Sequence, residues 1–340
     1  MDHIGRRLNY IGSKFPLLDW ILEALRTVVG LDTLEGVRIA DLFAGTGIVS
    51  YVLRTHGATV LSNDVELYSS IVAHAMTRSV YTPRCAELLA TLNATPGARP
   101  GYITQHYSPV GDRLFFTEAN ATRMDFLRQR IEDLRPELSH DEYQFLLASL
   151  IVSADAVSNV PAVYGCYLKA FKSKALAPLT LTPVHTNPTP PQQGSATTQC
   201  SVETLDLPAV DVVYLDPPYN GRQYSKNYFP LTILAKSPDA LAHEPPLKGK
   251  TGIPEGCFIS PFCQKKTVEA ALADLVARVP ARWVLLSYSS EGLLTRAQVE
   301  TCLARSGTVT VLERPYKRFK SFEYNETAPV TEYLFCLHKS

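Results

Sequence analysis

The sequence lacks several features that mark specialised classes of protein. Its 33 basic residues are balanced by 33 acidic residues, so the net charge is zero and no overall basic excess indicates nucleic-acid binding. No apolar run approaches the roughly 20 residues that cross a bilayer, and the first residues do not resemble a signal peptide. We therefore expect a cytoplasmic protein without membrane contacts, in which any basic surface is local.

Cysteine is also scarce, and its placement excludes two kinds of stabilisation. The seven cysteines are scattered, odd in number, and have no close metal-ligand spacing with histidine beside it. We interpret them as reduced thiols, as is usual inside cells. The sequence thus predicts neither a disulfide framework nor a metal site. The cysteines are Cys85, Cys166, Cys200, Cys257, Cys263, Cys302 and Cys336.

What the sequence does contain is a short apolar run that ends on an acid and two prolines, in "DVVYLDPPYN". Residues 212–215 are typical of a strand buried on both faces. Pro217 and Pro218 end that strand, because neither has an amide hydrogen to donate to the sheet. Asp216 and Tyr219 are then placed at the carboxyl end of a strand, where open α/β sheets bind ligands. The plainer alternative is a turn in which the acid caps the next segment.

A second strand end near the N-terminus has the same character. In "VRIADLFAGTGIVSYVLRTHG", residues 37–42 predict a strand, 44–47 a tight turn and 48–55 a helix. Residues 58–62 predict the next strand, which completes a right-handed βαβ unit.

The turn of this unit is suited to hold a ligand. Asp41 ends the first strand, and Gly45 and Gly47 allow the backbone to approach a ligand at the start of the helix. Asp64 follows the second strand, at the position that accepts hydrogen bonds from ribose hydroxyls. The turn could equally serve only strand–helix packing, and Asp64 could cap the helix that follows.

The rest of the chain falls into further regions. Residues 66–181 have mainly helical patterns, apart from a loop rich in proline and glycine at 93–112. Residues 182–199 carry four prolines and no aromatic side chain, which predicts an exposed linker. Residues 308–316 and 331–339 predict a closing hairpin. We therefore expect a core of residues 1–65 and 200–340, a helical insertion at 66–181 and a linker at 182–199.

Three motifs in a fixed order resemble one enzyme family. "NYIGSK" at 9–14, "DLFAGTG" at 41–47 and "DPPY" at 216–219 are similar to those of the D12-class, Dam-like α-group DNA adenine methyltransferases. Further stretches, such as "NVPAVYGCYLKAF" and "YNGRQYSKNYFPL", resemble the branch with FokI-type modification enzymes. The resemblance implies an α/β fold: a Rossmann-like class I methyltransferase sheet, mostly parallel with an antiparallel C-terminal hairpin strand. A mainly helical insertion would carry target recognition.

The resemblance also implies a reaction and a catalytic site. The enzyme would transfer a methyl group from S-adenosyl-L-methionine to the 6-amino group of an adenine flipped out of double-stranded DNA. Asp216 and the carbonyl of Pro217 would accept the two amine hydrogens, Pro217 and Pro218 would hold that carbonyl rigid, and Tyr219 would stack on the base. A restriction-modification or DNA-marking role follows, with a restriction endonuclease for the same target as a partner.

The family's cofactor positions can be carried over to matching residues here. They are Tyr10, Lys14, Asp41, Phe43, Gly45, Gly47, Asp64 and Asp216. The acid that usually precedes the catalytic strand lies in "QCSVETLDL", where Glu203 and Asp206 both qualify and neither is assigned. A lysine at the start of an amphipathic helix, such as Lys14, is also commonly just solvated.

DNA contacts are expected from local basic and aromatic residues. Arg222 and Tyr224 sit beside the catalytic turn, and short basic stretches lie elsewhere in the chain. The candidates are Arg222, Tyr224, Lys169, Lys172, Lys317, Arg318 and Lys320.

Two other functions remain open from the motifs alone. Similar turns occur in methyltransferases that act on guanine in RNA or on a protein glutamine, and a degenerate fold could merely bind nucleic acid. "NYIGSK" and the large insertion argue against the first, and the intact "DPPY" argues against the second.

Overall fold

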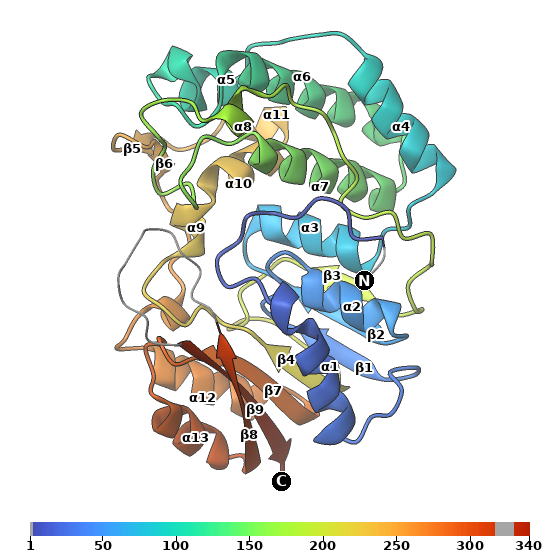
Figure 1. The fold of residues 1–340 in the computed structure, drawn as a ribbon, viewed down its shortest axis with the longest axis vertical. Coiled ribbons are helices and arrows are strands. Elements are labelled where there is room, and N and C mark those ends of the chain that lie inside the picture. The colour runs from blue at the N-terminus through green and yellow to red at the C-terminus, as the bar shows by residue number, and fades with distance from the viewer. Residues whose placement is uncertain (1–2, 317–329) are drawn as a thin grey trace. The chain divides into compact units, whose positions relative to one another are not determined.

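The structure, a computed structural model, describes residues 3–316 and 330–340 (Figure 1). It divides into two compact units, each built from three chain segments. The sheet unit comprises Gly12–Val65, Pro191–Gln223 and Ile259–Ser340. The helical unit comprises Met1–Ile11, Glu66–Pro190 and Tyr224–Phe258.

Within the described residues, the sheet unit contains a seven-stranded sheet flanked by helices. Its strands are β1 (Arg38–Asp41), β2 (Thr59–Asn63), β3 (Ala196–Thr198), β4 (Val210–Leu215), β7 (Ala281–Ser289), β8 (Gly307–Tyr316) and β9 (Val330–Lys339). Its α-helices are α1 (Leu18–Thr27), α2 (Ile48–Thr55), α12 (Val268–Arg278) and α13 (Arg296–Ala304).

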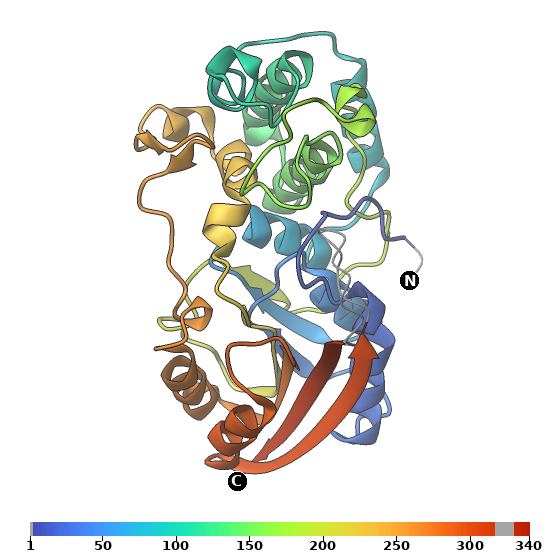
Figure 2. The same ribbon diagram turned by 60° about the vertical axis from the view of Figure 1, so that its left-hand side comes forward.

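The strand order is β3-β2-β1-β4-β7-β9-β8. Neighbours from β3 to β7 pair in parallel, whereas β9 pairs antiparallel with both β7 and β8. The curved β8–β9 hairpin closes one edge of the sheet (Figure 2). The predicted fold class, a mostly parallel sheet with an antiparallel C-terminal hairpin, is therefore confirmed.

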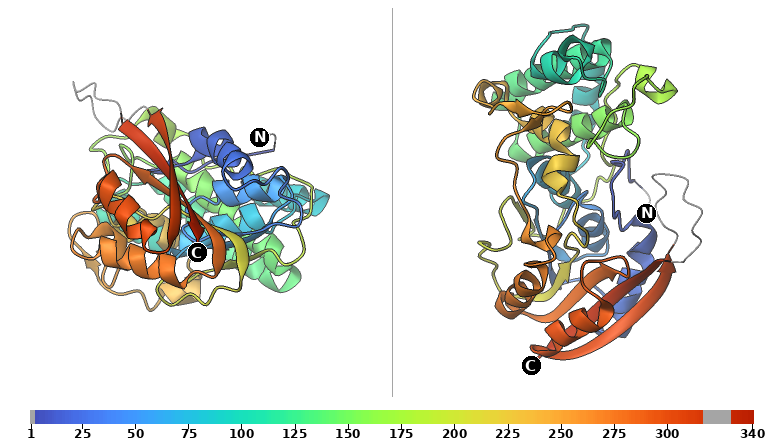
Figure 3. Two further views of the ribbon diagram at one scale, coloured as in Figure 1. Left: turned by 90° about the horizontal axis from the view of Figure 1, so that it is seen from below. Right: turned by 90° about the vertical axis from the view of Figure 1, so that its left-hand side faces the viewer.

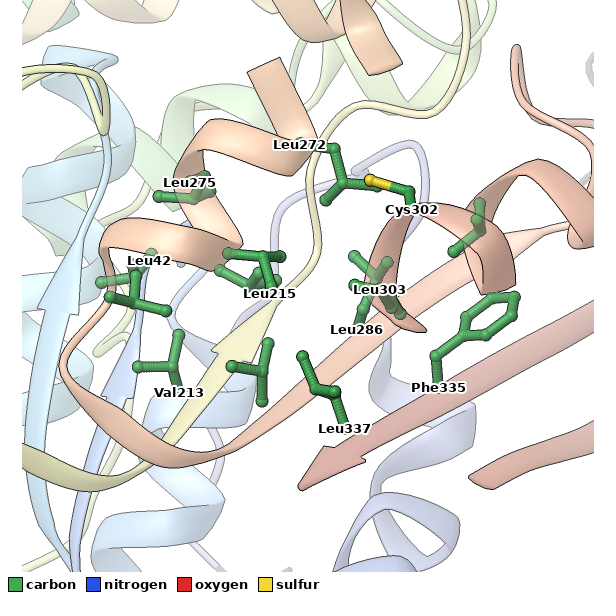
Figure 4. Close-up of a cluster of buried hydrophobic side chains, with 14 of the residues drawn as sticks. Leu42, Val213, Leu215, Leu272, Leu275, Leu286, Cys302, Leu303, Phe335 and Leu337 are labelled. Carbon is green, nitrogen blue, oxygen red and sulfur yellow. The ribbon is translucent and has the colours of Figure 1, made fainter. Parts of the chain in front are cut away.

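One face of the sheet packs on α12 and α13, and α1 and α2 lie on the other (Figure 3, left). Side chains alternate between the faces of a strand, so every second residue points toward α12 and α13. The resulting cluster is almost fully buried, and each such side chain stabilises the fold by about 1.5–3 kcal/mol. Its members include Leu42, Val213, Leu215, Leu272, Leu275, Leu286, Cys302, Leu303, Phe335 and Leu337 (Figure 4).

The helical unit is assembled from helices whose ends the sequence specifies. Ser139 and Glu142 form a capping box at the start of α7, and Thr82 and Thr117 cap α4 and α6. The helices are α3 (Leu67–Thr77), α4 (Pro83–Ala94), α5 (Tyr102–Tyr107), α6 (Glu118–Leu134), α7 (His140–Ala156), α8 (Ser173–Leu176), α9 (Tyr224–Asn227), α10 (Phe229–Ala235) and α11 (Pro238–Leu241). A two-stranded hairpin joins β5 (Leu247–Lys248) to β6 (Ile253–Pro254).

The expected exposed linker at 182–199 is exposed only in part: residues 188–190 and 192–194 are exposed, whereas other residues of the segment are buried or paired. His185 is fully buried and its ring lies 2.9 Å from the carbonyl of Ala75, and Val184 is also buried. Further on, β3 joins the sheet beside β2, and the hydroxyl of Ser195 accepts a hydrogen bond from the Val60 amide. The exposed prolines Pro188 and Pro190 thus lie between a buried part of the segment and the strand β3.

Two other boundaries differ from expectation. Residues 224–258 belong to the helical unit and not to the sheet core, because α10 packs on α3 and α7. The expected loop at 93–112 contains α5, whose first turn is held by Asp125: this carboxylate accepts hydrogen bonds from the amides of Gly101, Ile103 and Thr104. A distant side chain thus supplies the helix start that the local sequence lacks.

Two expected absences can be compared with the structure. All seven cysteines are free. Among the helices of residues 3–316 and 330–340, none has both the length and the apolar character needed to cross a bilayer.

The buried cluster of the sheet unit gives a first prediction. Leu286→Ala should lower the free energy of unfolding by about 2–5 kcal/mol, since it leaves a cavity between β7 and the helices. Urea denaturation followed by circular dichroism would measure this. The matched variant Leu176→Ala, in which the replaced side chain is 63% exposed, should change the free energy of unfolding by less than about 0.5 kcal/mol. Equal effects of the two variants would contradict the assigned core.

Candidate active site

The candidate site lies where the strand order of the sheet reverses, at the carboxyl ends of β1 and β4. On one side of this point β2 lies next to β1, and on the other side β7 lies next to β4. Asp41 ends β1 and pairs in register with Tyr214, and Asp216 follows β4 directly. Such switch points are the usual ligand sites of open α/β sheets.

Asp216 is held by a buried lysine. Its Oδ1 lies 2.7 Å from Nζ of Lys14, and the two side chains are only 18% and 4% exposed. The Lys14 ammonium also donates to the carbonyl of Gly12 at 3.0 Å. Lys14 is therefore part of the site and is not a solvated lysine at a helix start.

Burial and pairing act in opposite directions on this ion pair. Burial is the largest single effect and lowers the pKa of Lys14. The charge of Asp216, its hydrogen bond to Lys14, and the charges of Tyr219 and Glu332 together outweigh burial and raise that pKa above its ordinary value. Burial raises the pKa of Asp216, and Lys14 counteracts the increase. Lys14 thus helps to keep the Asp216 carboxylate ionised in a site that disfavours charge.

The glycine turn has the geometry that the motif predicts. Gly45 and Gly47 adopt positive φ angles of 54° and 68°, a region that favours glycine. The Gly45 amide donates to Oδ2 of Asp64 at 2.8 Å, which ties this turn to the end of β2. Among the described residues no side chain caps the start of α2, and the Gly47 amide donates to the Ala44 carbonyl at 2.7 Å within the turn.

Asp41 is a buried acid with one free oxygen. It is 1% exposed, and its Oδ2 accepts a hydrogen bond from Ser50 at 2.7 Å. Its Oδ1 has no hydrogen-bond partner among the described residues. Burial raises the pKa of Asp41 to about 7, and the carboxylates of Asp216 and Asp64 add to the increase. An orphaned acceptor of this kind fits a ligand that donates hydrogen bonds and carries positive charge.

The remaining residues of the catalytic motif are fixed by packing. Pro217 is buried, and the carbonyl of Tyr219 accepts a hydrogen bond from the Leu293 amide at 2.8 Å. The ring of Tyr219 is half-buried, packs edge-on against Tyr288 and lies with its centroid 5.4 Å from Nζ of Lys14. The motif is therefore a rigid turn in contact with the ion pair.

Two other predicted residues flank the site. Phe43 is half-buried and its ring packs edge-on against Phe262, with centroids 5.1 Å apart. Arg222 is exposed, and only its backbone makes the contacts that the structure records, with Asn220 and Cys263. Its guanidinium is thus available for a partner outside the chain.

One acid was missed by the sequence analysis. Glu332 on β9 is 5% exposed and stands opposite Ser289 of β7, on the sheet face that Tyr214 and Asp41 share. Burial raises its pKa to about 7; Lys14 lowers that pKa and Asp216 raises it. The sequence did contain a signal for its burial. In "VTEYLFCLHK", Glu332 alternates with Leu334 and Cys336, which are apolar and buried, so all three side chains point to the same face of the strand.

Tyr10 and Tyr224 belong to the helical unit, where they pack together. Tyr10 stacks on Tyr228 with centroids 5.0 Å apart and contacts Tyr224 at 5.3 Å. The Tyr224 hydroxyl donates to the Ile11 carbonyl at 3.1 Å. Ring contacts and a hydrogen bond therefore hold the "NYI" segment against the start of α9 within this unit.

The basic candidates have different environments. Lys169 is exposed, whereas Lys172 is half-buried, and its ammonium donates to the Val160 carbonyl. Burial and the neighbouring Lys174 lower the pKa of Lys172 to about 8. Lys317, Arg318 and Lys320 lie outside the described residues.

The acid expected before the catalytic strand stays unassigned. Glu203 and Asp206 are both exposed, and Glu203 forms hydrogen bonds only with nearby Ser201 in the contacts that the structure records, so neither is singled out for the cofactor. In the part of the chain that the structure describes, no group of three or more histidine, cysteine or acidic side chains could hold a metal ion.

Comparisons with known proteins agree with this geometry. Residues 10–244 match the family model described as D12 class N6 adenine-specific DNA methyltransferase. The type II methyltransferase M.CviAII of Paramecium bursaria Chlorella virus 1 is 37% identical over 341 residues, 98% of either chain. M.NlaIII of Neisseria lactamica is 35% identical over 98% of this chain and 100% of the relative, and M.FokI of Planomicrobium okeanokoites is 33% identical over 98% and 53%.

The environment of Asp41 predicts how stability depends on pH. Its pKa is about 7 in the folded protein and 3.8 ordinarily, so the folded state binds the proton more tightly. The contribution of Asp41 to the free energy of unfolding therefore decreases as the pH rises from about 4 to 7. Without ligands, Asp41→Asn should melt at a higher temperature than the wild type at pH 8, and the gap should shrink at pH 5.

Thermal melts at the two pH values would measure the gap. The exposed Asp32→Asn serves as the control, which should show no such pH-dependent difference. A gap for Asp41→Asn that is the same at pH 5 and pH 8 would contradict the raised pKa.

Proposed function

Because the chain belongs to the D12 class of N6 adenine-specific DNA methyltransferases, we propose that Asp216, Pro217, Pro218 and Tyr219 form its catalytic centre. The enzyme transfers a methyl group from S-adenosyl-L-methionine to the 6-amino group of adenine in DNA. The observation that carries the assignment of the centre is the buried Lys14–Asp216 pair at the carboxyl end of β4. It keeps an acceptor charged at the place where this fold binds its ligands.

The chemistry requires an acceptor of this kind. The lone pair of the adenine amine is delocalised into the ring, which makes the amine a poor nucleophile. Asp216 accepts one amine hydrogen on its Oδ2, because Lys14 bonds to Oδ1. The Pro217 carbonyl accepts the second hydrogen, so that the nitrogen becomes pyramidal and its lone pair is released for attack. The cofactor, when bound, supplies an activated methyl group on a positively charged sulfur.

Preorganisation is the main contribution of the remaining motif residues. Pro217 and Pro218 have fixed φ angles, and the Leu293 amide anchors the Tyr219 carbonyl, so the acceptors need little rearrangement during the reaction. Tyr219 stacks on the target base. Extruding an adenine from duplex DNA costs a few kcal/mol, and this stacking offsets part of that cost.

The cofactor site comprises the glycine turn and the acids around it. The free Oδ1 of Asp41 is the acceptor offered to it, the positive φ angles of Gly45 and Gly47 let the backbone approach it, and Asp64 is placed for the ribose hydroxyls. Phe43 provides aromatic surface, and Lys14 provides a positive charge beside Asp216. Tyr10 is proposed as a cofactor contact from the family motif alone.

We assign DNA contacts to basic residues and to one tyrosine. Arg222 and Tyr224 follow the catalytic turn in the chain, and Lys169 is exposed on the helical unit. Lys172 contributes charge only while it stays protonated, below a pKa of about 8. Lys317, Arg318 and Lys320 complete the set from the segment between β8 and β9. Contacts of this kind to phosphates position the duplex and do not read its sequence.

The biological role follows from the relatives. Relatives named as type II methyltransferases support a restriction-modification role, with an endonuclease for the same DNA target as the partner. The seven free cysteines fit action in the reducing cytoplasm. DNA from a host that expresses the enzyme should resist endonucleases that cut the methylated sequence.

The first test of the catalytic centre replaces the acceptor. Asp216→Asn should slow methyl transfer to DNA by at least about 100-fold, because the amide offers a weaker acceptor to the amine. Transfer of labelled methyl groups and a genome-wide map of methylated adenines in a host without this modification would measure it. The exposed Asp274→Asn is the matched control and should behave as wild type. Full activity of Asp216→Asn would contradict the assignment.

A second test concerns the electrostatic contact with DNA. Lys169→Ala should reduce the slope of log affinity against log salt by about 1, since one phosphate contact and its released counterion are lost. Binding to short duplexes between 50 and 200 mM salt, followed by fluorescence anisotropy, would show this. Lys266→Ala removes an equally exposed lysine from the sheet unit and should leave the slope unchanged. Identical slopes for the wild type and Lys169→Ala would exclude Lys169 from the interface.

A further inference from the structure

Three buried acids share one face of the sheet. The register aligns Asp41 of β1 with Tyr214 of β4, and Tyr214 bonds to Ser287 of β7 at 2.8 Å. Alternation along β4 places Asp216 on the same face, and alternation along β7 places Ser289 and its partner Glu332 there. Asp41 and Asp216 therefore lie at the ends of the neighbouring strands β1 and β4, and Glu332 lies on β9 beyond β7, all on the face opposite α12 and α13.

The charges around Glu332 are only partly compensated. Among the described residues, the positive group that acts on Glu332 is Lys14, and its ammonium already bonds to Asp216. Glu291 after β7 adds negative charge, the Ser289 hydroxyl bonds to Glu332, and Arg314 of β8 stands opposite Glu332 in register but is exposed. Among the described residues, Oε2 of Glu332 has no hydrogen-bond partner.

An arrangement of this kind is costly without a ligand. A buried carboxylate that lacks a partner loses hydration and gains little in return. Oδ1 of Asp41 has the same deficit on the same face. Glu332 interacts with Lys14 and Asp216, so a cation that enters beside that pair would compensate Glu332. The charged sulfur of S-adenosyl-L-methionine is such a cation.

We propose that Glu332 is a cofactor-binding residue that recognises the positive charge of S-adenosyl-L-methionine and so distinguishes it from the uncharged-sulfur product, S-adenosyl-L-homocysteine. This inference rests on the proposed cofactor site at the carboxyl ends of β1 and β4. The role differs from that of Asp216, which bonds to Lys14, and from that of Asp64, which holds the glycine turn. Glu332 gives the enzyme a means of releasing the product once the sulfur has lost its charge.

The test compares the two forms of the cofactor. Dissociation constants for both would be measured by calorimetry with the full chain at pH 8. Glu332→Gln keeps the size and polarity of the side chain but removes its charge. It should weaken binding of S-adenosyl-L-methionine about tenfold and binding of the product less than about threefold. Glu291→Gln, at an exposed position close by, should change neither constant to that extent.

Two further readouts separate this role from a structural one. Glu332→Gln should raise the melting temperature of the ligand-free protein at pH 8, because it removes a poorly compensated buried charge. Between pH 8 and pH 6, the wild type should lose part of its preference for the charged form as Glu332 becomes protonated, and Glu332→Gln should lose less. Glu332→Asp, which retains the charge, should recover part of the preference even where Glu332→Gln folds poorly.

The outcomes distinguish this inference from the function on which it rests. Equal weakening of both ligands by Glu332→Gln, or no weakening, would overturn the role of Glu332 while leaving the cofactor site intact. A wild-type protein that binds neither ligand would overturn the proposed cofactor site and this inference with it. Selective loss of the charged ligand, with recovery in Glu332→Asp, is the result we expect.

Discussion

The ion pair between Lys14 and Asp216 is the interaction around which the active site is organised. Two opposite charges with little solvent exposure are stable only when each has its partner in good geometry. The parallel strands β1 and β4 bring Asp41 and Asp216 to one edge, and the segment before α1 brings Lys14 to them. Removing either charge would leave the other buried and unpaired. The chain therefore depends on accurate placement of the "NYIGSK" and "DPPY" segments.

The sheet separates this polar site from the apolar core. One face packs against α12 and α13 with closely fitting aliphatic side chains, and the other face carries the acids at the ends of its strands. The core provides the stability that the buried carboxylates reduce. Asp41 and Glu332 both have pKa values raised to about 7 by burial, the sign of groups placed for ligands at a cost to stability.

The sequence predicted those parts of the fold in which local pattern and tertiary structure agree. Strands such as β4 and β9, the glycine turn and the capped helices α6 and α7 all carry their own signals. The segment 182–199 was misjudged because burial of His185 and pairing of β3 depend on distant residues. Helix α5 was missed for the same reason, since its start is held by Asp125. Glu332 was overlooked because its partners lie on β4, β7 and the segment before α1, which only the folded sheet brings near.

The site also has a consequence for how the protein matures. Lys14 stands near the beginning of the chain, Asp216 past its middle and Glu332 almost at its end, and the sheet that gathers them is built from three separate segments. Contacts so distant in sequence form late, because long loops must close first. On the ribosome, a chain that stops before β9 cannot complete this face of the sheet. The full set of acids therefore assembles only after the segment that carries Glu332 has been made.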